Sequence, residues 1–533
     1  MPDAVNTSRT DAVNTSPTAV VIGGGIAGLA TAALLGREGL RVVLLEARDE
    51  LGGRAGSWDR DGFRFDTGPS WYLMPDVFDH FFRLLGSSSA EEFPSTRLDP
   101  GYRVFFEGHP HPVDISADKQ LNLQTFEAIE AGAGASLDRY LVSAKDAYRI
   151  AIRRFLYTTF ASYRSFLAPE VLSRAARLAR LLLQPLDRFA AGHVTDRRLR
   201  QILGYPAVFL GSSPSMTPSM YHLMSHLDLE DGVYYPGGGF REVIASIARL
   251  AAREGVEIVT GARATAITTD DGQRPTVTGV RYVDADGSSS HLDADIVVSA
   301  ADLHHTETTL LPEKLRSRPQ KWWNNRVAGP GAILLYLGVH GELDQLAHHS
   351  LFFTRDWTEN FAQIFNPPTS IPNPASIYVC RPSATDPGVA PSGHENLFVL
   401  VPVPADPDLG SGGEDGTGDP IIEAAADEAI RQIGSWAKIP DLAERIVLRR
   451  TVGPADFARD FNSWKGSALG PAHTLRQSAF FRGRNISSRV TGLLYAGGTT
   501  VPGIGLPMCL ISAELVVKRL RGDTSSMPLE EPL

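Results

Sequence analysis

The sequence predicts an α/β fold in which a domain with a parallel sheet is interleaved along the chain with a second, mixed α+β domain. Two observations lead to this prediction. Between residues 18 and 45 an apolar strand, a glycine-rich turn, a helix and a second strand follow one another without a break. Between residues 493 and 520 a short apolar strand again leads through glycines into an apolar helix. The parallel sheet therefore draws on both ends of the chain.

The first turn carries the spacing G-x-G-x-x-G at Gly23, Gly25 and Gly28, directly after the apolar residues 19–22. The first glycine permits a tight turn, the second lets the backbone approach a pyrophosphate, and the third lets the helix press against the strand. Unpaired N–H groups at the start of the helix favour an anion there. The turn therefore predicts a dinucleotide site, with these cofactor contacts: Gly23, Gly25, Ile26, Ala27 and Gly28.

The residues that follow distinguish between dinucleotides. A second strand is expected at 40–45, and Glu46, eighteen positions after Gly28, ends it where a carboxylate can accept hydrogen bonds from a ribose diol. Gly52, Gly53 and Arg54 come next, and they combine close backbone approach with a guanidinium that can fork onto phosphate oxygens. This pair of signals favours FAD over NAD.

Composition bounds the class of protein. The 533 residues are 43% hydrophobic and 21% charged, which is typical of a globular chain with about two to four domains. A net charge of −10 without a basic, aromatic stripe argues against nucleic-acid binding. Only Cys380 and Cys509 are present, without metal-type or C-x-x-C spacing, and this fits a reducing cytoplasm. Residues 1–17 are polar and read as a disordered tail rather than a signal.

The chain is expected to switch between the two domains several times. Residues 116–233 have helical periodicity, whereas 306–489 mix helices with strand-like stretches that indicate an antiparallel sheet. A loop at 405–420 has five acidic residues and no basic one, and is expected to be flexible. The cofactor domain is assigned to 18–115, 234–305 and 490–522, the second domain to 116–233 and 306–489, and a final tail to 523–533.

The C-terminal stretch repeats the logic of the first turn. A strand at 493–496 leads into Gly497-Gly498, and then Pro502-Gly503-Ile504-Gly505 is expected to open a helix, with Pro502 near its start. A second helix N-terminus would thus face the cofactor. The further cofactor contacts expected from here and from the strand-forming stretch before residue 267 are Gly498, Thr499, Gly505, Leu506 and Ala264.

With these motifs in place, the chain resembles the carotenoid desaturases of the bacterial phytoene-desaturase type, within the amine-oxidase-like flavoproteins. The resemblance covers nearly the whole chain, and the matching stretches are the glycine fingerprint to Glu46, Gly52 to Arg54, FRFDTGPSWYL, YYPGGGFREVI, ADIVVSAADLHHT, LLYLGVHGELDQLAHHS and TTVPGIGLP. It implies a Rossmann-like FAD-binding domain interleaved with a substrate domain, which is an amine-oxidase/GDI-like architecture. Thr499, Val501 and Ile504 depart from the commonest family pattern, which leaves the identity of the carotene open.

The resemblance also implies the reaction. Two hydrogens leave a saturated C–C bond beside a polyene, as a hydride to flavin N5 and a proton, with oxygen or a quinone as final acceptor. Such a substrate needs an apolar tunnel, for which the sequence offers Phe155, Phe160, Phe209, Met216, Met220, Tyr221 and Leu223.

No nucleophile motif or paired carboxylates are present. Asp66 is a weak candidate for a general base, because an aspartate that initiates a turn is common. His222 and His226 at i, i+4 lack a third ligand, so no metal site is predicted. His304-His305 and His348-His349 match the family without a role that can be derived.

A membrane surface is the expected source of a carotene. Residues 149–190 carry eight arginines and two acidic residues, a net charge of +6, among aromatic and leucine side chains. This pattern fits helices that lie on an anionic membrane, and it also fits a solvated helical face. We expect a cytoplasmic, peripherally membrane-associated protein.

Two other functions share this architecture. One is a different flavoenzyme, such as a carotene isomerase that uses reduced flavin, an amine oxidase or a protoporphyrinogen oxidase. The other is a non-enzymatic prenyl or lipid carrier with a degraded cofactor site. The intact glycines, Glu46 and Arg54 favour an FAD enzyme over the carrier. The number of desaturations, a C30 or C40 substrate and the oligomeric state are not encoded in these patterns.

Overall fold

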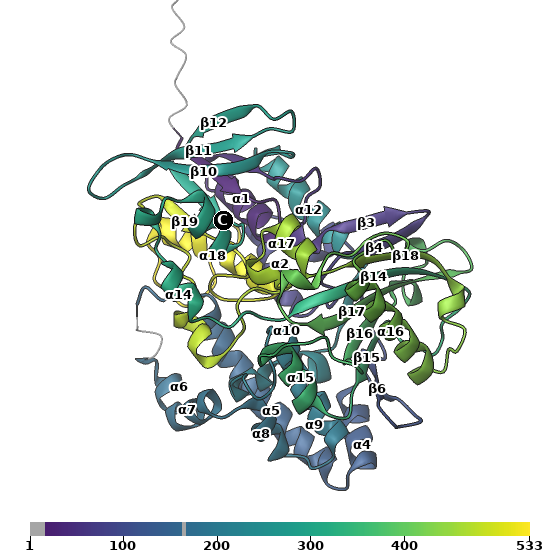
Figure 1. Cartoon of the computed structure of the whole chain (residues 1–533). Helices are drawn as coiled ribbons and strands as arrows, with labels where there is room; N and C mark the ends of the chain where they lie inside the picture. Colours follow the sequence, from purple (N-terminus) through teal and green to yellow (C-terminus); the bar gives the residue numbers. More distant parts are fainter. Residues whose placement is uncertain (1–15, 163–166) are drawn as a thin grey trace, which may run out of the picture.

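A computed structural model describes residues 16–162 and 167–533 of the chain (Figure 1). The expected N-terminal tail, residues 1–17, therefore lies almost wholly outside the described residues. The same holds for Arg164 and Phe166 of the basic segment.

The first sheet is parallel and is assembled from three distant parts of the chain. Its strand order is β19-β13-β1-β2-β9, and the central strand β1 pairs in register with both neighbours, Val20 opposite Val297 and Val43. The pairs β13–β19 and β2–β9 are also parallel. The strands are β1 (Thr18–Ile22), β2 (Arg41–Leu45), β9 (Glu257–Val259), β13 (Ile296–Ser299) and β19 (Leu493–Tyr495).

One face of this sheet is covered by three helices that share a core with β1 and β2. The central one, α1, is buried from Ile26 to Leu35, and it is apolar on all sides because it packs on the sheet and on two further helices. The three helices are α1 (Ile26–Arg37), α12 (Phe240–Arg253) and α18 (Leu506–Arg521). The predicted α/β fold with an N-terminal strand–turn–helix–strand unit is confirmed.

The other face of the sheet meets a three-stranded antiparallel layer, visible at the top of Figure 1. Ile267 and Val280 of this layer are buried against Val20 and Leu45. Two short antiparallel ladders, β3–β4 and β5–β8, are formed by segments that precede this layer in the chain. These strands are β10 (Arg263–Thr269), β11 (Val277–Val283), β12 (Ser289–Asp293), β3 (Ser57–Arg60), β4 (Phe63–Asp66), β5 (Ser95–Arg97) and β8 (Tyr234–Pro236).

The second domain is built on a seven-stranded sheet with the order β18-β14-β17-β16-β15-β6-β7. Only β15 and β6 pair in parallel; the other neighbours are antiparallel. The strands are β6 (Tyr102–Phe106), β7 (Val113–Ile115), β14 (Gly331–His340), β15 (His349–Phe353), β16 (Ile377–Cys380), β17 (His394–Val403) and β18 (Ile446–Val452). The boundary expected at residue 115 is therefore misplaced, since β6 and β7 belong to this sheet. A long-range parallel pairing leaves no local pattern from which to predict it.

Strand β14 shows how this sheet separates two cores. Ile333 and Leu335 point to one face and pack with Ile430 of α16 (Pro420–Trp436), whereas Leu334 and Tyr336 point to the other face, toward helices of residues 119–226. The helices of this part of the chain are α4 (Lys119–Ile129), α5 (Ala133–Ala151), α6 (Pro169–Leu172), α7 (Ala175–Leu183), α8 (Leu186–Ala191), α9 (Arg197–Gly204), α10 (Pro206–Phe209) and α11 (Met224–His226).

The remaining helices connect the layers: α2 (Pro75–Leu84), α3 (Ser89–Glu92), α13 (Leu303–His305), α14 (Gln320–Asn324), α15 (Trp357–Phe365), α16 (Pro420–Trp436) and α17 (Pro454–Phe461). Among the helices of residues 16–162 and 167–533, none combines the length and apolarity that a membrane crossing requires.

Two peripheral segments have more contacts than their composition suggests. In the acidic loop 405–420, Gly412 N donates to Asp456 at 2.7 Å and Gly413 N donates to Thr451 at 2.9 Å. In the final segment 523–533, the buried Lys518 ammonium donates to the carbonyl of Met527 at 2.6 Å, and Leu533 N donates to Leu84 O at 3.0 Å. Both segments are fastened to a domain by hydrogen bonds.

Candidate functional site

The first glycine turn is shaped by backbone sterics at the end of β1. Gly23 has φ +102°, a conformation that favours glycine, and Gly25 is the N-cap residue of α1. A Cβ on Gly28 would lie 1.8 Å from the carbonyl oxygen of Gly23, so no side chain fits there. The N-terminus of α1, with Ile26 and Ala27 in its first turn, is thereby held against the strand end.

Glu46 follows β2 and is 8% exposed. Its carboxylate accepts hydrogen bonds from Gly24 N at 2.6 Å and from Arg48 N at 2.8 Å, which fix its orientation beside the turn. Its carbonyl accepts from Ala262 N at 2.8 Å, so the start of β10, with Ala264, lies next to it. These contacts bring the expected ribose ligand and Ala264 to one edge of the first turn.

The second glycine pair faces the first turn directly. Gly52 N donates to Gly24 O at 2.9 Å, and Gly25 and Gly52 form a parallel bridge. A Cβ on Gly53 would lie 3.3 Å from Gly25 Cα, whereas a Cβ on Gly25 would find its nearest neighbour, Gly52 O, at 3.7 Å. The two turns make a cradle of bare backbone, as close approach to a pyrophosphate requires.

Arg54 extends from this cradle and retains an unused donor. Its Nη2 donates to Ser463 Oγ at 2.9 Å and lies 4.0 Å from Asp302 Oδ2, while its buried Nε has no hydrogen-bond partner. Burial lowers the pKa of Arg54, and the Asp302 carboxylate opposes that shift. A guanidinium with a free N–H beside bare backbone fits the phosphate of a dinucleotide.

The C-terminal turn lies against the same region. Thr499 Oγ1 accepts from Leu303 N at 3.3 Å, which ties the turn to the residue after Asp302. A Cβ on Gly498 would have no neighbour closer than 3.7 Å. Helix α18 begins at Leu506 with Gly505 as N-cap. The expectation that Pro502 stands at the helix start is wrong, because three residues separate it from α18 and Pro507 occupies the first turn instead.

Two buried polar side chains hold this turn in place, and the sequence did not single them out. Arg482 donates to the carbonyl oxygens of Gly498 at 2.6 Å and Thr500 at 3.2 Å, and burial lowers its pKa to about 10. Asn485 Nδ2 donates to Val501 O at 2.9 Å. Both belong to the stretch 482–485, which has no motif or spacing that could have revealed them.

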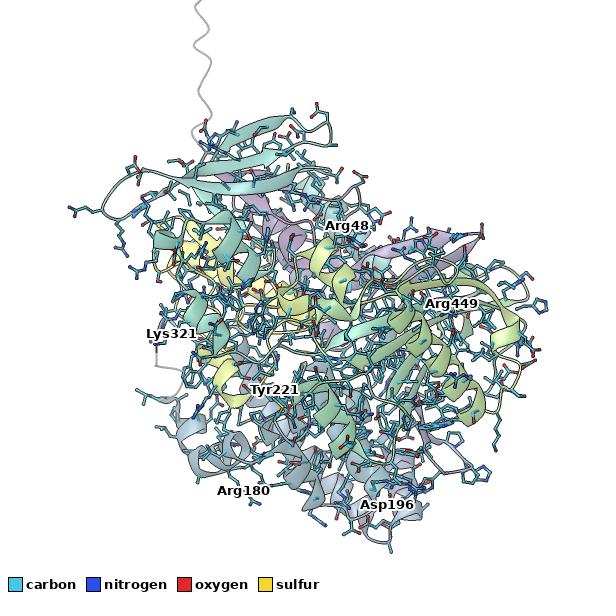
Figure 2. All side chains as sticks on the ribbon, in the orientation of Figure 1. Arg48, Arg180, Asp196, Tyr221, Lys321 and Arg449 are labelled. Atoms are coloured by element: carbon cyan, nitrogen blue, oxygen red, sulfur yellow. The ribbon has the colours of Figure 1, made fainter. Side chains whose placement is uncertain are left out.

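The second domain meets the C-terminal turn through an apolar contact. A Cβ on Gly211 would lie 3.4 Å from Ile504 Cδ1. The centroids of the Tyr221 and His473 rings lie 5.6 Å apart. A Cβ on Gly503 would in turn lie 2.3 Å from His473 Nε2. Burial lowers the pKa of His473 far below its ordinary value, so this imidazole is neutral. Figure 2 shows Tyr221 near the middle of the view, where its side chain is half-buried.

The proposed tunnel side chains do not form one cluster. Phe209 packs on Trp71, with 5.2 Å between ring centroids, and Met220 contacts the same core. Phe155 packs with Ile150 and Val171, whereas Phe160 packs against the core of the first domain. Tyr221 contacts His473 beside the C-terminal turn, and Phe209, Met216, Tyr221 and Leu223 are all half-buried.

Asp66 ends β4 and caps a helix. Its carboxylate accepts from the first N–H groups of α12, Phe240 at 2.8 Å and Arg241 at 3.1 Å. Burial raises the pKa of Asp66 to about 6, against the lowering effect of these two bonds. These contacts give Asp66 a structural role as a helix cap. The sequence had also indicated a structural role for Asp66, but as the residue that initiates a turn.

The histidine pairs have separate partners. His222 Nε2 lies 2.9 Å from Ser143 Oγ, whereas His226 Nδ1 lies 2.9 Å from Glu230 Oε2, so the two rings do not share a ligand position. His304 packs on Trp323, with 4.9 Å between ring centroids, and Asp302 caps the short helix α13 that carries His304 and His305.

Comparison with known proteins decides the family. Residues 26–521 match the family described as flavin containing amine oxidoreductase. A carotenoid 3,4-desaturase of Haloarcula japonica is 39% identical over 94% of this chain and 98% of its own length. A zeta-carotene-forming phytoene desaturase of Myxococcus xanthus is 34% identical over 94% of this chain and 93% of its own.

The chain belongs to the flavin-containing amine oxidoreductases, among the carotenoid desaturases. Solved structures agree on the fold: an oxidoreductase from Methanosarcina mazei has a TM-score of 0.59 at 16% identity and covers 94% of this chain and 100% of its own. A putrescine oxidase has a TM-score of 0.58 at 14% identity and covers 95% and 99%. The enzyme is thus an FAD-dependent oxidoreductase, as the glycine turns and Glu46 predicted.

Proposed function

We propose that this enzyme introduces C–C double bonds into phytoene or a related linear carotene that it takes from a membrane surface. The observation that carries the proposal is the identity of 34% and 39% to two carotenoid desaturases across 94% of the chain. FAD supplies the hydride acceptor for such a reaction when it is bound.

The chain's own residues have separable tasks in this proposal. The backbone of Gly25 and Gly53 would accommodate the pyrophosphate, Glu46 the ribose, and Arg54 a phosphate oxygen through its unpaired Nε. The turn from Gly498 to Gly505 and the N-terminus of α18 would close the site from the other side. Fixed N–H groups and a fixed guanidinium orient the cofactor without reorganisation.

The apolar side chains at the C-terminal turn would bind the carotene. Ile504 meets Gly211 there, and Phe209 continues the same chain segment to Trp71. Neutral His473 adds no charge to this wall. The buried Arg482 guanidinium at this turn donates to the backbone carbonyl oxygens of Gly498 and Thr500, because leaving a buried charge unpaired beside a hydrocarbon would be costly.

A second candidate function is 3,4-desaturation of a carotenoid. It is favoured by the 39% identity to a protein named carotenoid 3,4-desaturase, against 34% for the phytoene desaturase. The two functions share the cofactor site and differ in which bond is held at the reacting position. They are therefore separated by the substrate that is consumed.

The assay uses purified protein, FAD and liposomes that contain either phytoene or lycopene. Stepwise visible polyene bands from phytoene are the expected result. Consumption of lycopene but not phytoene would establish the second candidate and overturn the first. Turnover under argon with a quinone, compared with turnover in air, identifies the final electron acceptor.

The membrane surface we propose lies on α6, α7 and the turn Ala479–Phe481. Leu167, Leu172 and Leu183 are 67%, 54% and 73% exposed, and Phe480 and Phe481 are 45% and 47% exposed. The Phe160 and Phe480 rings lie 6.4 Å apart, so the turn adjoins the basic segment. Exposed leucines at this density are unusual on a surface that faces water alone.

Charges on this surface suit anionic headgroups. Arg153, Arg180 and Arg188 are exposed, and Figure 2 shows Arg180 at the lower edge of the molecule. Other arginines of the segment are paired: Arg154 with Glu170, and Arg174 and Arg177 with Asp146. The exposed cations and leucines would lie together at the interface.

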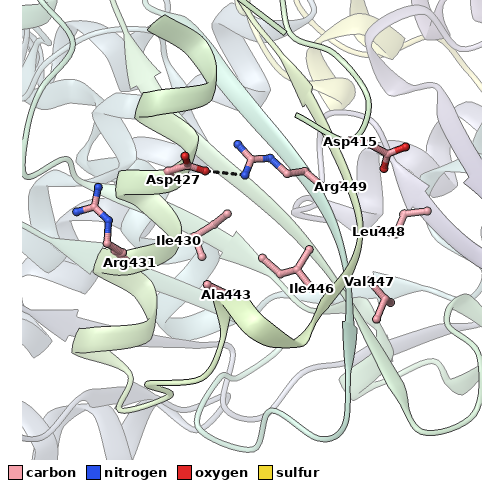
Figure 3. A pocket seen from close by; sticks show the side chains of 9 residues that line it. All are labelled: Asp415, Asp427, Ile430, Arg431, Ala443, Ile446, Val447, Leu448 and Arg449. Atoms are coloured by element: carbon pink, nitrogen blue, oxygen red, sulfur yellow. Dashed lines mark hydrogen bonds and ion pairs between the residues drawn. The ribbon is translucent and has the colours of Figure 1, made fainter. Parts of the chain in front are cut away.

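The double variant Leu172→Gln/Leu183→Gln tests the surface. It should shift the protein from the pellet to the supernatant when sedimented with anionic liposomes. The matched control, Ile421→Gln/Val447→Gln, removes two leucine-like side chains that are 55% and 57% exposed on α16 and β18. Val447 lines a shallow hollow of about 500 Å³ between those elements (Figure 3). Equal sedimentation of both variants would contradict the proposal.

A further inference from the structure

Three potential metal ligands meet where two strands of the second sheet begin and end. His349 opens β15 and pairs with Cys380, the last residue of β16, and His348 directly precedes it. The three side chains are buried, with exposed fractions of 5%, 0% and 1% for His348, His349 and Cys380. One potential ligand atom from each lies within 4.8 Å of the other two.

Both imidazoles have one satisfied and one unsatisfied nitrogen. His348 Nδ1 lies 2.7 Å from Thr385 Oγ1, and His349 Nδ1 lies 2.8 Å from the hydroxyl of Tyr378. Each Nε2 is buried without a hydrogen-bond partner. An imidazole whose outer nitrogen is hydrogen-bonded and whose inner nitrogen is free has the arrangement of a metal-ligating histidine.

A small hollow adjoins two of these side chains. It is lined by His348 and Cys380 together with Asp66 and Ser70, and its volume of about 10 Å³ is enough for one water-sized atom. Its lining is mainly apolar, but Asp66, Ser70 and His348 among the lining residues are polar partners that a bound water could contact.

We propose that His348, His349 and Cys380 bind one Zn²⁺ ion, with a water in the adjoining hollow as the fourth ligand. Two imidazole nitrogens and a thiolate suit zinc, which prefers nitrogen and sulfur ligands in tetrahedral geometry. On binding, Cys380 releases its thiol proton to solvent, and both imidazoles stay neutral. The Asp66 carboxylate faces the same hollow and offsets the remaining positive charge.

The site would hold one wall of the substrate domain. The His349 ring stacks on Trp71, with 4.6 Å between centroids and 12° between planes, and the hydroxyl of Tyr378 lies 2.6 Å from Ser70 Oγ. Residues 70 and 71 follow Gly68, where a Cβ would lie 2.1 Å from the carbonyl of Arg54. A metal bound here would therefore fix residues 70 and 71, which lie between the cofactor cradle and Phe209.

The sequence predicted no metal site because Cys380 is thirty-one positions from His349, which is not a recognisable ligand spacing. Cross-strand pairing brings them together, and that pairing is visible only in the fold. The proposal does not depend on the carotene assignment, because its evidence is the ligand geometry alone.

The first measurement is the metal content of the full-length holoenzyme, expressed with zinc supplementation and dialysed. We expect about one equivalent of zinc, with sulfur and nitrogen neighbours in its X-ray absorption spectrum. Cys380→Ser should lose the sulfur neighbour, and His349→Gln should lower the zinc content at least tenfold. His226→Gln, which removes a buried histidine elsewhere, should retain the metal.

Less than a tenth of an equivalent in the wild-type protein, or a zinc shell without sulfur, would overturn the proposal. Stoichiometric copper in place of zinc would overturn the zinc assignment. If a variant fails to fold, judged by its circular dichroism, the absorption spectrum of the wild-type protein decides the matter alone.

Discussion

The two glycine-rich turns lead into α1 and α18 by similar sequence patterns, but the fold constrains them differently. In the first turn a Cβ on Gly28 would meet the backbone oxygen of Gly23 at 1.8 Å, which cannot move. In the second a Cβ on Gly503 would meet the side chain of His473 at 2.3 Å. The first turn is rigid because backbone packs on backbone, whereas the second is shaped by side chains that could rearrange. The same sequence pattern can thus bind a common cofactor at the rigid first turn and accommodate different substrates at the second turn.

The largest effect is expected for Gly28→Ala. Relief of a 1.8 Å contact requires the helix to separate from β1, so this variant should be insoluble or should purify without flavin. Gly503→Ala should remain a folded flavoprotein with a lower Tm, because the His473 ring can shift, whereas φ +148° at Gly503 still strains an alanine. Flavin content per chain, read from absorbance, compares the two. Similar flavin loss in both variants would break the distinction between the turns.

Arg54→Gln should weaken FAD binding about tenfold to a hundredfold, because it removes a charge-assisted contact to phosphate. Arg450→Gln is the control: its guanidinium also lies over aromatic rings, 5.0 Å from the Trp58 centroid and 6.0 Å from the Tyr336 centroid, but on β18 of the second domain. Fluorescence titration of the apoprotein with FAD measures both affinities. Equal Kd values for the two variants would remove Arg54 from the site.

The variants Gly25→Ala and Gly505→Ala test whether backbone strain differs between the two turns. Both positions leave 3.7 Å to the nearest atom for a Cβ, but φ is −72° at Gly25 and +117° at Gly505. Alanine is unstrained in the first case and strained by about 1–3 kcal/mol in the second, because the backbone conformation at Gly505 is essentially restricted to glycine. We expect unchanged apoprotein Tm with weaker FAD binding for Gly25→Ala, and a Tm lower by a few degrees for Gly505→Ala.

An apoprotein Tm that falls equally in both variants would show that strain does not separate the two turns.

The smallest effect concerns pH and Asp66. A carboxyl whose pKa is raised to about 6 in the folded state stabilises the fold fully below its unfolded pKa, and this stabilisation is lost as pH rises through 6. The shift corresponds to about 3 kcal/mol at most. Relative to wild type, Asp66→Asn should therefore gain Tm between pH 4.5 and pH 7. Exposed Asp293→Asn should run parallel to wild type, and a parallel Asp66→Asn curve would contradict the pKa assignment.

The sequence was most informative where function is carried by local backbone shape. The glycine turn from Gly23 to Gly28 and the strand expected at 493–496 follow from residue type and spacing alone. Glu46 follows from its place at a strand end. These features need no knowledge of the second domain.

Features that depend on long-range packing could not be predicted in the same way. Strands β6 and β7 were assigned to the wrong domain because only their pairing with β15 reveals their sheet. Arg482 supports the C-terminal turn by donating to backbone carbonyls, a role that no side-chain pattern encodes. The convergence of His348, His349 and Cys380 likewise depends on strand register.

The central claim is that this FAD enzyme oxidises a carotene, and an anaerobic single turnover tests it most directly. Oxidised holoenzyme is mixed with phytoene liposomes under argon while flavin and polyene absorbance are followed together. Bleaching of the flavin in step with a longer polyene is the predicted result. A flavin that stays oxidised while phytoene and lycopene remain unchanged, or a carotene that changes geometry only after the flavin is reduced chemically, would contradict the account.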